Sequence, residues 1–264
     1  MSAKDLLVRP ITPTVAREFI RRVHYSHTVT PNSQLHFGVF YSGRLEGAMS
    51  FGPPLDRAKI LPLVRDSAWV EVIELNRLAF TEALPRNSES RALAVVFRLI
   101  RRFAPQVKWV ISFADGTQCG DGAIYRAAGF LLTQIKPNLN LARLPNGEVI
   151  HMLTLKSSML QPRPELGGRS YVDIAGGYGG WPIYLREARA ELLQGFQLRY
   201  LYFLDPAARA RLTVPVLPYS AIAAAGASMY RGERKADSGR SAPAGRGGAN
   251  PTRSLQSEPE EGTR

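Results

Sequence analysis

Apolar and polar positions along the first fifty residues follow two different periods. Two apolar-rich runs, 35–41 and 45–51, are separated by a short polar turn, which predicts a β-hairpin. Before them, a hydroxyl residue and a proline, Thr12-Pro13, begin a run with helical spacing that extends to about Val23. Residues 5–9 form a short apolar run that ends at a proline, as expected of a first strand.

The stretch from Glu74 to Phe130 alternates between the two periods, and the rest of the chain is organised around it. The run over 107–114 is almost continuously apolar, which is typical of a central strand covered on both faces. In order, we expect a strand over 69–80, a helix over 91–103, a strand over 107–114 and a short helix over 123–128. This alternation predicts an α/β fold with a mixed central sheet and helices on both faces.

The second half of the chain changes in character near residue 160. Two late strands, 131–135 and 149–156, are expected to pair with each other, followed by an irregular glycine- and aromatic-rich segment over 161–182. A short helix over 185–193 and a strong strand over 198–204 come next. We therefore expect a core over 1–160, a C-terminal extension over 161–231 packed on the core, and a disordered tail over 232–264 that is poor in large apolar residues.

The chain carries a formal net charge of +12. From residue 231 to the end there are seven basic and five acidic residues, so a net charge of about +10 remains on the body. A basic folded body favours a polyanionic partner, and nucleic acid is the first candidate.

Cysteine usage and hydropathy indicate the compartment. The single cysteine, Cys119, excludes an intrachain disulfide framework and fits a reducing cytoplasm. No apolar run approaches the length of a membrane-spanning helix, and the first residues do not have the pattern of a signal peptide. We expect a cytoplasmic protein with no membrane partner.

The polar turn from Pro85 to Arg91 is the first candidate for chemistry. A strand, a turn and a helix start present free backbone N–H groups at the positive end of a helix dipole, a geometry that binds phosphates or carboxylates. Ser88, Ser90 and Arg91 are the expected cofactor contacts in this turn. The simpler alternative is a capping box that stabilises the helix alone.

Asp115 is the second candidate, because it follows the apolar run over 107–114. Ligands of open α/β sheets gather outside the carboxyl ends of the strands, where a carboxylate can act as a general base or a metal ligand. Asp115-Gly116 is equally a turn-forming pair.

The third candidate is the histidine-rich segment His24-Tyr25-Ser26-His27 at the end of the first helix. A histidine with a nearby carboxylate can bind a divalent metal or transfer a proton, although capping or surface roles explain such residues as well. If His24 acts in its neutral form with an ordinary pKa near 6.5, activity falls as the pH drops below that value.

Several of these segments together resemble known families. The string Glu74-Leu75-Asn76-Arg77-Leu78-Ala79-Phe80, the serine- and arginine-led helix after it and the segment 125–130 resemble the GNAT acetyltransferase superfamily. The segments 24–27, 113–115 and 198–219 resemble, more closely, the bacteriophage Mom proteins. The resemblance covers roughly residues 5–235 and implies a GNAT-like acyltransferase fold for the core.

The Mom resemblance implies a site, a reaction and its partners. Members place a carbamoylmethyl group on the 6-amino nitrogen of adenine in phage DNA, which protects the DNA from restriction enzymes, so it implies double-stranded DNA as partner and the bacterial host cell as location. It implies iron, with His24 and Asp115 as ligands, and a match of Ser90 to a serine at the start of the helix on the cofactor side. The implied catalytic residues are His24, Tyr25, Tyr41, Arg77, Asp115 and Tyr125.

The group donor is left open by the turn over 85–90. It does not have the glycine-rich pattern of ordinary acetyltransferases, so the donor is either acetyl-CoA or another small molecule such as an activated glycine. Two alternatives to DNA modification stay open: a coenzyme A-dependent N-acetyltransferase for a small amine or protein, and a non-catalytic DNA-binding protein on the same scaffold.

Overall fold

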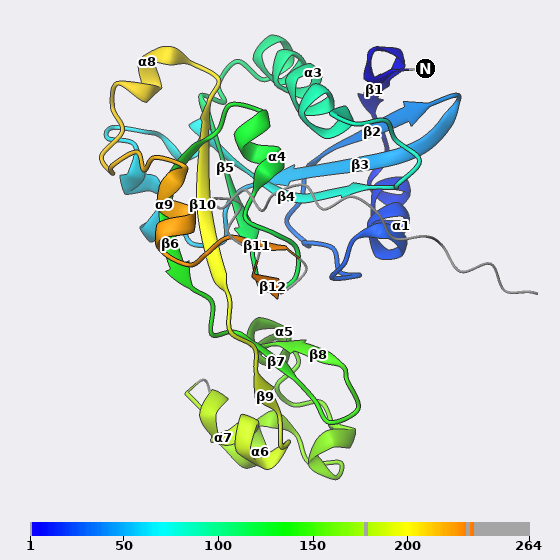
Figure 1. Ribbon diagram of the computed structural model, residues 1–264, viewed down its shortest axis with the longest axis vertical. Coiled ribbons are helices and arrows are strands. Elements are labelled where there is room, and N and C mark those ends of the chain that lie inside the picture. Colours follow the sequence, from blue (N-terminus) through cyan, green and yellow to red (C-terminus); the bar gives the residue numbers. More distant parts are fainter. Residues whose placement is uncertain (1, 177–178, 231–232, 235–264) are drawn as a thin grey trace, which may run out of the picture.

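A seven-stranded sheet forms the centre of the molecule, and a smaller lobe lies below it (Figure 1). The computed structural model describes residues 2–176, 179–230 and 233–234. The strand order in the sheet is β1-β2-β3-β4-β5-β10-β6. In that order the strands span Leu7–Pro10, Leu35–Tyr41, Arg44–Gly52, Val72–Phe80, Trp109–Asp115, Phe196–Phe203 and Leu131–Pro137.

Helices cover both faces of this sheet. On one face lie α3 (Ser88–Phe103) and α4 (Ala123–Ala127); on the other lie α1 (Pro13–Val23) and α2 (Arg57–Ile60). Two short helices, α8 (Pro206–Arg209) and α9 (Ser220–Ala224), follow the last long strand. The expected α/β class with a mixed sheet and helices on both faces is therefore confirmed.

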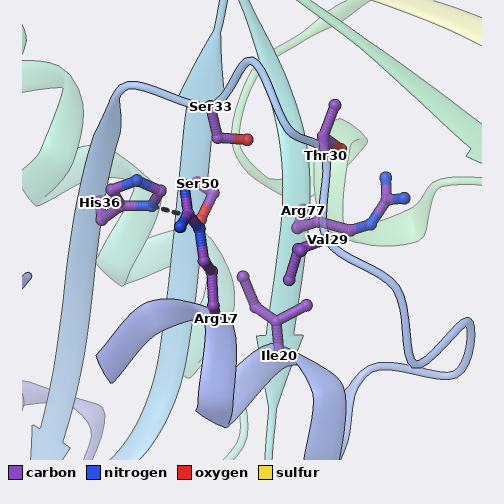
Figure 2. Close-up of a pocket in the computed structure, with 8 residues that line it drawn as sticks. All are labelled: Arg17, Ile20, Val29, Thr30, Ser33, His36, Ser50 and Arg77. Atoms are coloured by element: carbon purple, nitrogen blue, oxygen red, sulfur yellow. Dashed lines mark hydrogen bonds between the residues drawn. The ribbon is translucent and has the colours of Figure 1, made fainter. Parts of the chain in front are cut away.

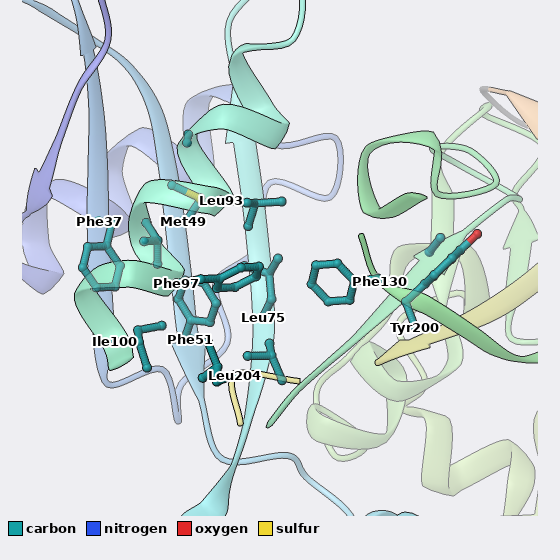
Figure 3. Close-up of a cluster of buried hydrophobic side chains, with 14 of the residues drawn as sticks. Phe37, Met49, Phe51, Leu75, Leu93, Phe97, Ile100, Phe130, Tyr200 and Leu204 are labelled. Atoms are coloured by element: carbon teal, nitrogen blue, oxygen red, sulfur yellow. The ribbon is translucent and has the colours of Figure 1, made fainter. Parts of the chain in front are cut away.

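The main hydrophobic core lies between the sheet and α3 (Figure 3). Phe97 and Ile100 of α3 are buried against Phe51 of β3 and Leu75 of β4. Successive residues of β5 point to opposite faces: Val110 joins this core, whereas Trp109 and Ile111 join the cluster around α2. The continuous apolar run of β5 thus serves two cores at once, which confirms it as a central strand.

The lower lobe is an insertion between two neighbouring strands of the main sheet. It leaves β6 after Pro137 and returns at the start of β10. Its own sheet, in the order β8-β7-β9, comprises Val149–His151, Leu141–Arg143 and Glu191–Leu192, and its helices α5, α6 and α7 span Met152–Ser157, Tyr171–Ala175 and Trp181–Glu187. A separate cluster of buried residues holds it together: Ala142, Leu144, Ile150, Leu155, Leu166, Tyr171, Trp181, Tyr184 and Ala188.

The insertion changes the expected division of the chain at residue 160. β10, which we assigned to a C-terminal extension, lies inside the main sheet and pairs with β5 over Gln197–Phe203. The lobe with its own core instead begins at about residue 138 and ends at about residue 195. The predicted tail over 232–264 lies outside the described residues except for β12 (Glu233–Arg234), which pairs with β11 (Met229–Tyr230).

The expected pairing of 131–135 with 149–156 is wrong. β6 pairs with β10, and only the first residues of the later segment are extended, as β8, which pairs with β7. From Met152 the chain is helical, because the His151 ring accepts a hydrogen bond from the Leu153 amide and caps α5. Apolar spacing identified an extended segment but not its partner, since the partner is set by contacts distant in sequence. The helix expected over 185–193 begins earlier, at Trp181 with Pro182 in its first turn, and ends at Glu187.

No helix within the described ranges combines the length and the apolar character needed to cross a bilayer.

Gly122 is a backbone position that only glycine satisfies. Its φ is +81°, and a Cβ there would lie 2.5 Å from the Tyr200 ring, whose hydroxyl donates to the Asp121 carbonyl. Replacing Gly122 with Ala should destabilise the fold by about 2–4 kcal/mol, through backbone strain together with the steric clash. Gly147→Ala is the matched control, because its φ is +88° but its Cβ would meet nothing within 4 Å. Urea unfolding of both variants measures the difference; equal losses would contradict the clash.

Candidate functional site where β4 and β5 diverge

The parallel strands β4 and β5 are paired over only three residues each. The register runs from Val72 opposite Trp109 to Glu74 opposite Ile111 and then stops. Beyond that point β4 remains bonded to β3 and β5 to β10, so the two halves of the sheet separate. The Ser112 hydroxyl donates to the Leu75 carbonyl at 3.2 Å where the strands part. The resulting opening lies at the carboxyl ends of parallel strands, where α/β proteins hold their ligands.

Four structural elements bring side chains to this opening. Glu74 and Arg77 come from β4, Asp115 from the end of β5, Tyr125 from α4, and Tyr25 from the segment after α1. These groups affect one another's pKa. Burial, and then the Asp115 carboxylate, raise the pKa of Tyr25. Burial raises the pKa of Tyr125 to about 12, and Glu74 contributes to that increase. Four of the predicted catalytic residues, Tyr25, Arg77, Asp115 and Tyr125, thus lie in one neighbourhood.

Tyr25 combines a partly open ring with a crowded hydroxyl end. The residue is 43% exposed, yet burial and the Asp115 carboxylate raise the pKa of its phenol above the ordinary value. Its ring lies 4.2 Å from the His24 ring, centroid to centroid. Tyr25 is therefore a partly exposed aromatic residue beside Asp115, with a second ring against its own.

Asp115 forms the expected turn and also presents a carboxylate. Its carbonyl accepts from the amides of Cys119 and Gly120, at 2.8 and 3.1 Å. Its Oδ1 accepts from the Thr117 amide at 2.9 Å and from the Asn138 side-chain amide at 3.1 Å. Among the described residues Oδ2 has no hydrogen-bond partner, so it is the oxygen that remains to accept from a ligand.

His24 is held by a chain of hydrogen bonds that ends at Arg77. The Ser26 amide donates to His24 Nδ1 at 3.2 Å, and the Ser26 hydroxyl contacts both this nitrogen and Thr28 Oγ1. Arg77 donates to the Thr28 carbonyl at 2.9 Å and to its hydroxyl at 3.2 Å. Arg77 therefore fixes the loop that carries His24 and Tyr25.

Figure 2 shows this loop beside a small cavity on the α1 face of the sheet, with the Arg77 guanidinium directed away from Ser50. The cavity has no room for a water molecule. His36, which lines it, is bonded through Nδ1 to the Ser50 hydroxyl at 2.8 Å, and its buried Nε2 has no partner among the described residues. His36 packs in this cavity and not in the opening.

Burial changes the expected pH behaviour of His24. Desolvation, reinforced by Arg77 and His27, lowers the pKa of His24 to about 3, so the ring stays neutral at every physiological pH. The predicted fall of activity below pH 6.5 cannot come from this residue.

Glu74 is a functional candidate that we did not single out from the sequence. Burial raises its pKa to about 7, against smaller opposing effects of Asn76 and Arg77. A carboxylate with such a pKa exchanges protons near neutral pH, which is what a general base requires. The signal was present: a glutamate between Ile73 and Leu75 in a buried strand is a costly residue.

His151 is the second residue that sequence reasoning missed. It stands at the end of β8 in the inserted lobe, and burial lowers its pKa, with Asp115 and Arg77 as its charged neighbours. It lies more than thirty positions after Asp115, in a segment expected to be an ordinary strand. No sequence pattern pointed to it.

The remaining predicted residues either lie away from the opening or form hydrogen bonds with backbone carbonyls. Tyr41 is paired with Arg44 at the turn of the hairpin. It lies five residues, or about 17 Å, along β2 from His36, which is level with Arg77 across β3; the structure does not bring it to the opening. The Ser88 hydroxyl is buried and donates to the Pro85 carbonyl, and Ser90 donates to the Asn87 carbonyl at 3.3 Å. Arg91 reaches the Lys4 carbonyl. In this turn the amides of Glu89 and Ser90 have no acceptor among the described residues.

The implied iron does not fit the residues that were expected to bind it. An amide can only donate, so His24 Nδ1 accepts and the neutral ring carries its proton on Nε2, leaving no free lone pair. Asp115 has one open oxygen. Within the described ranges, no group of three or more His, Cys, Asp or Glu side chains is placed to hold a metal. Tetrahedral and octahedral sites need more ligands than these two residues provide.

Comparison with known families identifies the chain. Residues 5–221 match the model of the Mom protein family, so the chain belongs to that family. It is 34% identical over 223 residues to the methylcarbamoylase Mom of Escherichia phage Mu, across 82% of this chain and 84% of that protein.

Solved structures resemble the chain only distantly. An N-acetyltransferase from Staphylococcus aureus Mu50 is 10% identical, with a TM-score of 0.42 over 76% of this chain and 99% of that one. The N-acyl amino acid synthase FeeM, from uncultured soil microbes, is 13% identical, with a TM-score of 0.40 over 79% and 95% of the two chains. Because these scores are low, the evidence for the architecture is the strand order of the chain's own sheet.

Buried neutral His24 makes stability pH-dependent. Its folded pKa is below the unfolded value, so its contribution is complete above about pH 6.5 and is lost as the pH falls toward 3. Between pH 6.5 and 5 this amounts to about 2 kcal/mol. When the pH is lowered from 7.5 to 5.0, the free energy of unfolding measured in urea should fall about 2 kcal/mol less in His24→Gln than in the wild type. The control is His27→Gln, at an exposed histidine that makes only the smallest contribution to the shift of the His24 pKa; its free energy of unfolding should fall nearly as much as that of the wild type. An unchanged fall in His24→Gln would refute the assignment.

Proposed function

We propose that this protein modifies DNA by transferring a carbamoylmethyl group to the 6-amino nitrogen of adenine. Family membership and the 34% identity to a methylcarbamoylase support this reading. The observation that carries it is the opening between β4 and β5. There the partly exposed Tyr25, an Asp115 oxygen that has no hydrogen-bond partner among the described residues and a glutamate with a pKa of about 7 come together. Those are the groups that a transferase needs to stack a base, hold an amine and remove its proton.

Each side chain has a part in the reaction. The adenine must leave the helix, because its amine is paired inside the duplex, and Tyr25 provides a surface on which it stacks. Asp115 Oδ2 accepts a hydrogen bond from the amine. As the amine nitrogen attacks the donor carbon, the new N–C bond forms, the leaving group departs with the electrons of its bond, and Glu74 takes the amine proton. Arg77 and Tyr125 border the same opening and hold these groups in place.

The DNA backbone requires a basic surface beside the opening. Arg17 and Arg21 are exposed on α1, four residues apart and thus on one side of the helix that leads into Tyr25. Neither takes part in an ion pair among the described residues, whereas arginines such as Arg126 and Arg211 are paired with carboxylates. Unpaired arginines on this helix are suited to phosphate contacts.

A coenzyme A-dependent N-acetyltransferase is the alternative, with its pyrophosphate at the amino end of α3. The free amides of Glu89 and Ser90 favour an anion there, while the Glu89 carboxylate opposes it. Coenzyme A retained through purification, together with no affinity for DNA, would favour this alternative.

The direct test is mass spectrometry of nucleosides from cells that express the protein. We expect an adenine nucleoside heavier by one carbamoylmethyl group, and plasmid DNA that resists restriction enzymes. Unmodified DNA from cells containing well-folded protein would overturn the proposal.

Glu74→Gln removes the general base while preserving size. The rate in an extract of the expression host, which supplies the donor, should fall about 10²–10⁴-fold. In the wild type the rate should rise with pH up to about 7 and then level off, because the base must be ionised. Glu148→Gln, the same change at an exposed position of the lobe, should leave the rate unaffected. A wild-type rate that is flat from pH 5.5 to 8.5 would exclude Glu74 as the base.

Replacing Arg17 and Arg21 together with Ala should weaken binding of duplex DNA regardless of sequence. The slope of log K against log salt should decrease by about two, one for each lost phosphate contact. Arg98→Ala with Arg102→Ala is the matched control: an exposed pair, also four residues apart, on α3 at the opposite face. Equal effects of both pairs would show that α1 is not the DNA-binding element.

A further inference from the structure

The inserted lobe reaches the opening through two residues near its attachment to the sheet. Asn138 follows β6 directly, is almost fully buried and donates to Asp115 Oδ1 at 3.1 Å. Its own amide donates to the Gly195 carbonyl, so the outgoing and returning strands of the lobe are joined beside Asp115. His151 is the second residue: it pairs with Leu141 of β7, three positions along the chain after Asn138. The lobe is therefore part of the site as well as an appendage of the sheet.

The hydrogen bonding of His151 fixes which ring nitrogen carries the proton. The Leu153 amide donates to Nδ1 at 3.0 Å, and a backbone amide cannot accept. Nδ1 is therefore the acceptor, and the neutral ring carries its hydrogen on Nε2. Burial lowers the pKa of the ring, which favours its neutral form, and Asp115 and Arg77 are the charged groups that act on it. His151 thus provides a neutral N–H donor on the side of the opening that holds the Asp115 carboxylate.

An acceptor and a donor on one side of the opening match one edge of adenine. The 6-amino group donates a hydrogen bond, and the neighbouring ring nitrogen N1 accepts one. Enzymes that act on an extruded base read it by hydrogen bonds to this edge. Asp115 Oδ2 is the available acceptor, and Nε2–H of His151 is a donor for N1.

We propose that His151 is a specificity-determining residue, whose Nε2–H donates to N1 of an extruded adenine while Asp115 Oδ2 accepts from its 6-amino group. This inference rests on the proposed function and names the way in which the base is selected. Guanine and thymine carry an oxo group and a ring N–H at the corresponding positions, so both hydrogen bonds would be reversed and these bases rejected. An unpaired buried polar group on either side is what makes such rejection strong.

The test uses a base that differs from adenine only at N1. The full-length protein is titrated with an oligonucleotide duplex that contains one unpaired adenine, and with the same duplex containing 1-deazaadenine, which has C–H in place of N1. The wild type should bind the adenine duplex about tenfold more tightly, the effect expected from one hydrogen bond. In His151→Asn the preference should disappear.

His151→Asn is chosen so that the fold is preserved. Asparagine is a favoured helix-capping residue and can still accept from the Leu153 amide, but its side chain is too short to extend a donor in place of Nε2–H. His27→Ala, at an exposed histidine outside the opening, should keep the tenfold preference. A preference that survives in His151→Asn, or that is absent from the wild type, would overturn the inference.

The outcome is separate from that of the proposed function. Mass spectrometry of DNA from cells expressing the wild type shows whether adenine is modified at all. Modified adenine together with equal binding of the two duplexes would refute the role of His151 alone. Unmodified DNA and no DNA binding would refute the proposed function itself.

Discussion

The short parallel pairing between β4 and β5 is the constraint on which the rest of the structure depends. Three residues of each strand join the two halves of the sheet, and the strands then remain with their antiparallel neighbours. A sheet that divides in this way leaves backbone and polar side chains facing one another across an opening. Tyr25, Glu74, Arg77, Asp115 and Tyr125 all lie there. The same strands remain anchored elsewhere, because Val110 and Ile111 of β5 are buried in separate cores.

Burial shifts the proton affinities of the site in opposite directions. It lowers the pKa of His24 to about 3 and raises that of Glu74 to about 7, because each charged form is disfavoured away from water. The histidine is thereby fixed as a neutral group that backs Tyr25, while the carboxyl group exchanges protons near neutrality. In the proposed reaction the general base is therefore a glutamate and not a histidine, the residue type usually associated with that role.

The inserted lobe has a core of its own but is joined to the main sheet at the site. Asn138 bonds to Asp115, and Trp181 of α7 donates to the Leu139 carbonyl at 2.9 Å, so the connection is held from both sides. Belonging to the Mom family explains neither contact by itself. Both follow from where β6 ends and β10 begins, at the same edge as the end of β5.

The sequence by itself determined the hairpin of β2 and β3, the helices α1 and α3, the double-sided burial of β5 and the candidacy of Asp115, because period and turn chemistry are local properties. Only the tertiary structure decided that β10 enters the sheet between β5 and β6, that Tyr41 lies away from the opening and that His151 approaches it. Those outcomes depend on pairings between segments distant along the chain. Glu74 depends on both. Its unusual position, an acidic residue inside an apolar strand, is visible in the sequence, but its raised pKa is a consequence of burial in the folded protein.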